Sequence, residues 1–101
     1  MPNLSFVIAA DHPSLPGHFP GKPVVPGAVL LDRAIETAER AIGRPITRVV
    51  VAKFPRPLLP GTPCSIEIDI GERGQIRLRC MAAHDAVLTA VVECDQPTDA
   101  R

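Results

Sequence analysis

The sequence predicts a single α+β domain in which one helix packs against an antiparallel sheet. Three observations support this prediction. Residues 27–42 have helical periodicity, about five other segments have the composition of strands, and four of those strands follow one another after the helix. The chain has 101 residues, which suits one domain, so we expect residues 1–101 to fold as a unit.

The chain starts with a β-prone run, residues 4–10, followed by a loop. Residues 11–27 contain five prolines, so this segment cannot form a regular helix or strand. We interpret His12 as a solvent-exposed loop histidine.

Residues 27–42 are predicted to form the helix, because Gly43 and Pro45 directly follow and are typical of a helix end. Asp32 lies at the rim of its apolar face, since Ala28 and Ile35 are its neighbours on adjacent turns. Apolar residues at helical spacing form a predicted buried stripe: Leu31, Ala34, Ile35, Ala38 and Ile42.

The start of this helix lacks a side-chain cap. Pro26-Gly27-Ala28 offers no Ser, Thr, Asp or Asn oxygen to the first backbone N–H groups. Those donors must find water, backbone or a ligand. A carbonyl oxygen placed there would meet free donors and the positive end of the helix dipole, which an oxyanion site requires.

The segment after the helix is predicted to be a strand, residues 46–54. Its Val49-Val50-Val51 centre is apolar enough to be covered on both faces. Residues 55–63 contain four more prolines and a glycine, which predicts a rigid turn.

Two further segments, 64–70 and 75–80, alternate apolar and polar residues as half-buried strands do. We predict an antiparallel hairpin with opposite charges paired on its outer face, Glu67 with Arg79 and Asp69 with Arg77, and with Ile66 opposite Cys80 and Ile68 opposite Leu78 on its inner face.

The last strand is predicted over residues 86–94. His84 lies in the turn before it and is expected to have no chemical role. Residues 96–101 are expected to form a frayed tail.

Composition excludes several classes of function. The formal net charge is zero, which does not suit a nucleic-acid or membrane-surface protein. Residues 1–57 carry a charge of +3 (seven Lys and Arg, four Asp and Glu), and residues 58–101 carry −3 (four and seven). A basic first half would suit an acidic carrier protein. The sequence contains no signal peptide and no apolar run long enough to cross a bilayer, so we expect a cytoplasmic protein.

The three cysteines, Cys64, Cys80 and Cys94, are odd in number and lack CxxC spacing. We interpret them as buried thiols in a reducing compartment, and we expect neither a metal nor a cofactor.

The loop before the helix carries the chemistry. Pro20, Pro23 and Pro26 stiffen it, with His18 at one end and Asp32 on the second helical turn at the other. Histidine titrates near neutrality and a carboxyl group can be tuned by burial, so the two could abstract and return protons.

The run from His18 to Gly27, His-Phe-Pro-Gly-x-Pro-x-x-Pro-Gly, with Asp32 fourteen positions after the histidine, resembles the β-hydroxyacyl-(acyl carrier protein) dehydratases of bacterial fatty acid synthesis. The run 53–61 is also similar to the second strand and turn of that family. The shortness of the chain resembles the small members found in aryl polyene and related clusters. The resemblance implies a hotdog fold, in which an antiparallel sheet wraps around one central helix.

The resemblance also implies roles for individual residues. His18 would take the α-proton of a 3-hydroxyacyl thioester, Asp32 would protonate the departing hydroxyl, and the Gly27 amide would hold the thioester carbonyl. Substrate-contacting positions would be completed by Phe19, Val25 and Ala28.

Partners follow from the same resemblance. We expect an acyl carrier protein bearing the substrate, and a homodimer or higher homo-oligomer, or a heterodimer with a related hotdog subunit. The histidine of one subunit would face the acidic residue of the other. Two alternatives remain: a hotdog thioesterase, which would use a helix carboxylate and water, and a non-catalytic hotdog subunit that binds acyl carrier protein.

Overall fold

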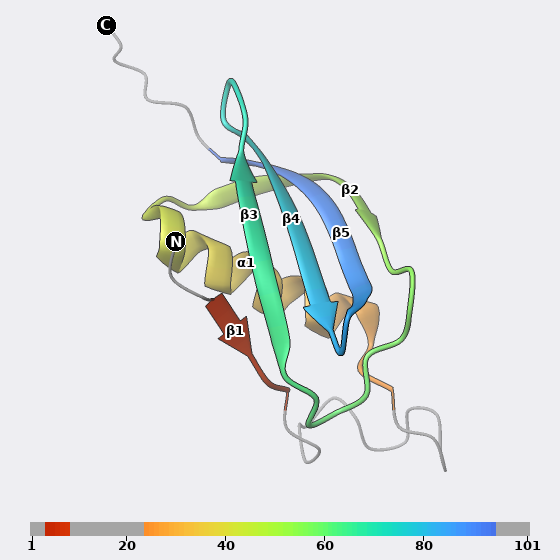
Figure 1. The fold of residues 1–101 in the computed structure, drawn as a ribbon. Coiled ribbons are helices and arrows are strands. Elements are labelled where there is room, and N and C mark those ends of the chain that lie inside the picture. The colour runs from red at the N-terminus through yellow and green to blue at the C-terminus, as the bar shows by residue number, and fades with distance from the viewer. Residues whose placement is uncertain (1–3, 9–23, 95–101) are drawn as a thin grey trace, which may run out of the picture.

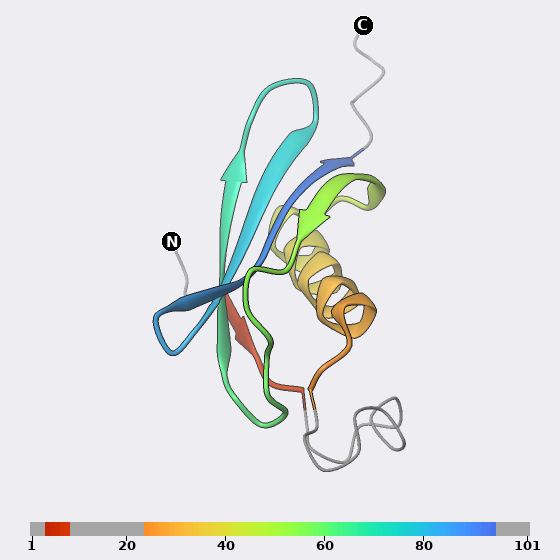
Figure 2. The ribbon, with the colours of Figure 1, turned by 90° about the vertical axis from the view of Figure 1, so that its right-hand side faces the viewer.

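The computed structural model describes residues 4–8 and 24–94. The helix and the strands are, in chain order, β1 (Leu4–Phe6), α1 (Gly27–Ile42), β2 (Ile46–Lys53), β3 (Cys64–Ile70), β4 (Gln75–Ala82) and β5 (Asp85–Cys94). The strands form one antiparallel sheet in the order β1-β3-β4-β5-β2. The sheet lies over α1 (Figure 1) and curves around it (Figure 2), which is the α+β arrangement that the sequence predicts.

The helix has the predicted bounds. Gly43 ends it in the left-handed conformation, with φ of 73°, and its N–H donates to the carbonyl oxygen of Glu39 at 2.8 Å. The Glu39 carboxylate also accepts a hydrogen bond of 2.7 Å from the N–H of Ile46, the first residue of β2. One side chain therefore ties the end of α1 to the next strand.

The buried face of α1 differs from the predicted stripe. Leu30, Ala34 and Ala38 are the buried residues of the helix, whereas Leu31, Ile35 and Ile42 are only partly buried. The sequence missed Leu30, because both it and Leu31 are apolar and periodicity alone does not choose between them. The position of the curved sheet determines that Leu30 is the buried one of the two. The small side chains of Ala34 and Ala38 let the helix approach the sheet closely.

The predicted register of the β3–β4 hairpin is confirmed. Glu67 lies opposite Arg79, Asp69 opposite Arg77, Ile66 opposite Cys80 and Ile68 opposite Leu78. The ion pairs found in the described part of the chain involve other carboxylates, so the charged partners face each other across the strands without forming ion pairs.

The prediction that both faces of the valine-rich strand are covered is wrong for the single chain. Val49, Val50 and Val51 are 40%, 43% and 41% exposed. The reason is topological: among the described strands, β2 lies at the edge of the sheet and pairs with β5 alone, and two register shifts interrupt this pairing. The segment ends at Lys53, one residue before the predicted end.

The core lies between α1 and the inner face of the sheet. Its fully buried large side chains include Ile8, Leu30, Ile76 and Leu88. The three cysteines are buried free thiols, as predicted. Burial raises the pKa of Cys80 to about 12, with a smaller contribution from the neighbouring Cys64, whose pKa is also raised by burial. Cys64 and Cys80 therefore pack as small apolar groups and are poor nucleophiles.

A strained turn joins β4 to β5. Ala83 and His84 have φ of 51° and 73°, and Ala82 pairs with Asp85 across the turn. Two-residue turns with positive φ at both positions favour Asn-Gly, because other residues pay a steric cost. His84 thus lies in the predicted turn. The predicted tail 96–101, His12 and residues 9–23 of the proline-rich loop lie outside the described residues.

Replacing Ala83-His84 with Asn-Gly should stabilise the protein by about 1 kcal/mol, because the strain is relieved at both positions. Urea denaturation should give a higher midpoint with an unchanged slope. An unchanged or lower midpoint would show that the native turn costs little.

Candidate functional site

The start of α1 has unsatisfied donors. The Pro26 carbonyl accepts hydrogen bonds from the N–H groups of Val29 at 3.0 Å and Leu30 at 3.1 Å, and Pro26 provides no side-chain cap. Within the described chain, the N–H groups of Gly27 and Ala28 have no backbone partner. Two donors and the positive end of the helix dipole are therefore available here to an acceptor oxygen.

The chain before the helix is anchored to the loop after β2. The N–H of Val25 donates to the Leu58 carbonyl at 2.8 Å. Both side chains are buried, at 4% and 2% exposure. This contact joins segments more than thirty positions apart and fixes the approach of the chain to Gly27.

An open cavity of about 480 Å³ lies at this point, lined by residues 24–27, by Leu30, and by four residues of the β2–β3 loop: Phe54, Arg56, Pro57 and Leu58. The ring of Phe54 lies against Gly27, where an added Cβ would come within 3.0 Å of Cζ. Glycine therefore permits close contact between the helix start and an aromatic wall.

Asp32 lies outside this lining. It is an exposed residue on the second turn of α1, on the same side as the exposed Ala28 four residues earlier. The structure thus brings Val25 and Gly27 together in the cavity, whereas Ala28 and Asp32 face solvent in the single chain. His18 and Phe19 lie outside the described residues.

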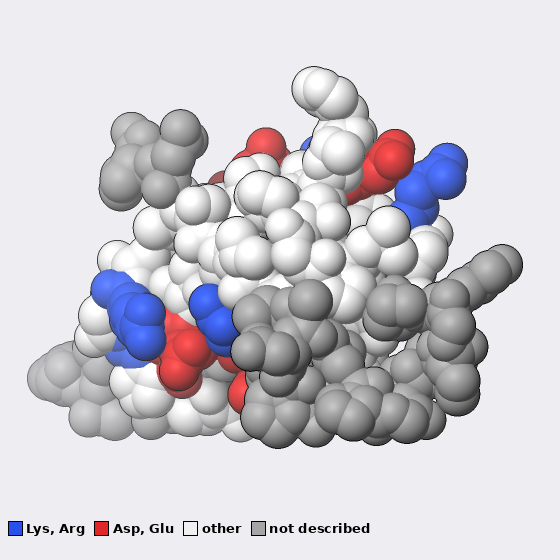
Figure 3. Space-filling view, turned by 90° about the horizontal axis from the view of Figure 1, so that it is seen from below, with Lys and Arg blue, Asp and Glu red and all other residues white. Residues whose placement is uncertain are grey.

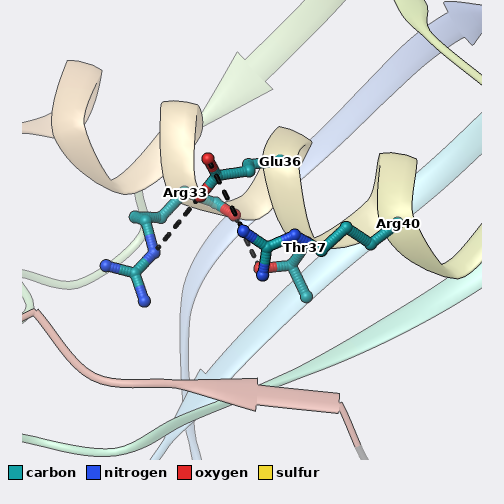
Figure 4. Close-up of polar contacts among 4 residues, drawn as sticks. All are labelled: Arg33, Glu36, Thr37 and Arg40. Atoms are coloured by element: carbon teal, nitrogen blue, oxygen red, sulfur yellow. Dashed lines mark hydrogen bonds and ion pairs between the residues drawn. The ribbon is translucent and has the colours of Figure 1, made fainter.

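The next turns of the helix surface carry a charge network. Glu36 lies 3.8 Å from Arg33 and 3.9 Å from Arg40, and the Thr37 hydroxyl donates to the Arg33 carbonyl at 2.8 Å (Figure 4). These charges engage one another, and among the described residues no cation pairs with Asp32. Its carboxyl group is therefore available to a ligand or to a second chain.

Sequence reasoning missed Phe54, Arg56 and Leu58 as cavity residues. The only signal in the sequence was the similarity of residues 53–61 to the second strand and turn of the family named above. That similarity assigned no role to these side chains. Their position depends on the long-range bond between Val25 and Leu58.

Among the described residues, no group of three or more His, Cys, Asp or Glu residues is placed to hold a metal ion. No helix in that part of the chain is long and apolar enough to span a bilayer. On the face seen from below, the charged side chains of the described residues lie in small groups of mixed sign (Figure 3).

Comparison with known proteins identifies dehydratases as relatives of this chain. The family model described as ApeI dehydratase, or ApeI-like, matches residues 2–91. The 3-hydroxyacyl-[acyl-carrier-protein] dehydratase FabZ of Bartonella quintana is 32% identical over 98 residues, which cover 85% of this chain and 63% of the relative. The FabZ of Brucella ovis is 31% identical, with 85% and 62% covered. The chain thus spans less than two thirds of the length of these relatives.

Two solved structures share the fold. The dehydratase heterocomplex ApeI:P of Xenorhabdus doucetiae matches with a TM-score of 0.74 at 21% identity, over 91% of this chain and 84% of that chain. An uncharacterized protein from Erwinia carotovora subsp. atroseptica matches with a TM-score of 0.75 at 19% identity, over 96% and 84%. The hotdog fold expected from the sequence is confirmed.

Proposed function

The chain belongs to the ApeI-like dehydratase family, and from this premise we propose that it eliminates water from 3-hydroxyacyl thioesters to give trans-2-enoyl thioesters. The observation that carries the proposal is the uncapped start of α1, where Gly27 faces an apolar cavity and Asp32 follows on the next turn. We also propose that residues 1–101 act as one catalytic domain.

The elimination needs a base, an acid and a stabiliser of developing negative charge. The His18 imidazole takes the α-proton, and the electron pair of that C–H bond forms the new double bond. The C–O bond breaks, and Asp32 supplies the proton with which the hydroxyl leaves as water. The Gly27 N–H donates to the thioester oxygen, which carries negative charge in the transition state.

An acyl carrier protein is the proposed carrier of the substrate. The curated relatives bear that carrier in their names. Apart from Arg56, the lining of the cavity is apolar and compatible with an acyl chain, and its position at the helix start supports a contact between the carbonyl oxygen and the free donors.

The proposed enzyme works as a dimer whose sites are shared between subunits. Two observations support this: Asp32 is exposed in the single chain, and β2 leaves an apolar sheet edge uncovered. The partner is a second copy or a related hotdog subunit. The second arrangement is proposed because the structurally similar ApeI:P assembly is a dehydratase heterocomplex.

Incubation with a 3-hydroxyacyl thioester tests the proposed reaction. A dehydratase yields the enoyl thioester, detected by its absorbance and mass. Release of free acid would indicate a thioesterase, and recovery of unchanged substrate, alone and with a candidate hotdog partner, would indicate a non-catalytic subunit.

Complementation tests the shared site. The variants His18→Ala and Asp32→Ala should each be inactive, whereas a mixture unfolded and refolded together should recover roughly a quarter of wild-type activity. About half of the dimers are then mixed, and each has one intact site of two. Verified subunit exchange without recovery would mean that both residues act within one chain.

A further inference from the structure

One cation lines the described part of the cavity at the start of α1. It is Arg56, and the other described residues of the lining are glycine, proline and aliphatic or aromatic side chains. The Arg56 side chain is 67% exposed, which places its guanidinium on the solvent side of the cavity.

The guanidinium has spare donors. Its ion pair runs from Nε to Oδ1 of Asp85 at 3.8 Å, which is longer than a hydrogen bond. Such a pair between exposed side chains contributes little to stability. The two terminal nitrogens of Arg56 make no hydrogen bond to other described residues, so a planar fork of donors remains for a ligand.

The partner of Arg56 comes from the strained turn. Asp85 directly follows Ala83 and His84, whose positive φ values carry a steric cost. Strained backbone of this kind clusters near functional sites. The turn sets a counter-ion beside Arg56 that an incoming anion can displace.

We propose that Arg56 binds the phosphate of the arm that carries the acyl group. This inference rests on the proposed function, because acyl carrier proteins hold the acyl thioester on a phosphopantetheine arm with a phosphate at its far end. The thioester would lie at Gly27, against Phe54. Arg56 follows Phe54 by two residues, at most about 7 Å of backbone, and its side chain extends further towards solvent. A guanidinium matches the oxygens of a phosphate in bidentate geometry.

Titration of the full chain followed by NMR tests the proposal with two ligands that differ only in the phosphate, pantetheine 4′-phosphate and pantetheine. Wild type should bind the phosphorylated arm about tenfold more tightly, as expected for a charge-assisted hydrogen bond. Arg56→Ala should reduce this ratio to about one, and Arg56→Lys should retain part of it. The matched control Arg77→Ala removes an exposed charge from β4 and should keep the wild-type ratio.

Three results would overturn the proposal: equal binding of the two ligands by wild type, a phosphate preference that survives in Arg56→Ala, or a loss of affinity for both ligands in that variant. The last would point to a contact with the arm itself. The titration measures binding and not turnover, so it distinguishes this inference from the proposed function. If Arg56 gives a preference for the phosphate but the protein forms no enoyl product, this inference holds and the proposed function fails.

Discussion

Asp32→Asn should lower the rate of dehydration by about 10²- to 10⁴-fold, the contribution of a positioned general acid. An amide has nearly the shape of the carboxyl group but cannot supply the proton that the proposed mechanism assigns to Asp32. His18→Ala should cause a loss of similar size, because it removes the proposed base. The measurement is the turnover of a 3-hydroxyacyl thioester at saturating concentration.

Glu36→Gln is the matched control for Asp32→Asn. Glu36 is an exposed carboxylate one turn further along α1, and its ion pairs with Arg33 and Arg40 are long. Exposed pairs of this kind contribute about 0–1 kcal/mol, so neither turnover nor folding should change much. If Asp32→Asn kept most of the wild-type turnover, Asp32 would not be the acid.

Leu88→Ala should destabilise the protein by about 2–5 kcal/mol. Leu88 lies in β5 and is fully buried, at 0% exposure. Truncation removes its transfer free energy and leaves a cavity in the core. The total free energy of unfolding of a small domain is about 5–15 kcal/mol, so a loss of this size should clearly lower the urea midpoint.

Leu59→Ala makes the same chemical change at a residue that is 58% exposed. It lies in the β2–β3 loop and should change the free energy of unfolding by roughly 0.5 kcal/mol or less. Similar losses in the two variants would mean that Leu59 is covered in the folded protein, for example by a second subunit.

Local chemistry allowed much of the fold to be predicted. Gly43 and Pro45 predict the end of α1, and alternation predicts the β3–β4 pairing down to Glu67 opposite Arg79. The errors concern tertiary context. An apolar strand such as Val49-Val50-Val51 has the same sequence pattern in the middle of a sheet and at its edge, and only the strand order decides which it is.

The same distinction between local chemistry and tertiary context applies to the candidate site. The uncapped helix start could be predicted because capping depends on neighbouring residues, Pro26 to Ala28. Phe54 beside Gly27 and Arg56 in the same cavity could not be predicted, because their positions depend on a loop that returns to the helix over a long separation in the sequence. The pairing of His18 with Asp32 stays a prediction.

The strand order also determines the course of folding. β3, β4 and β5 are neighbours both in sequence and in the sheet, so their pairing closes short loops, whereas β2 must reach β5 and β1 must reach β3 across long ones. Loop-closure entropy grows with loop length, and local pairings form faster. We therefore expect the central strands β3, β4 and β5 to pair early, and the edge strands β1 and β2 to join the sheet late. Since the cavity needs residues 54–58 beside the start of α1, we expect the candidate site to be completed late in folding, together with the part of the core that Val25 and Leu58 contribute.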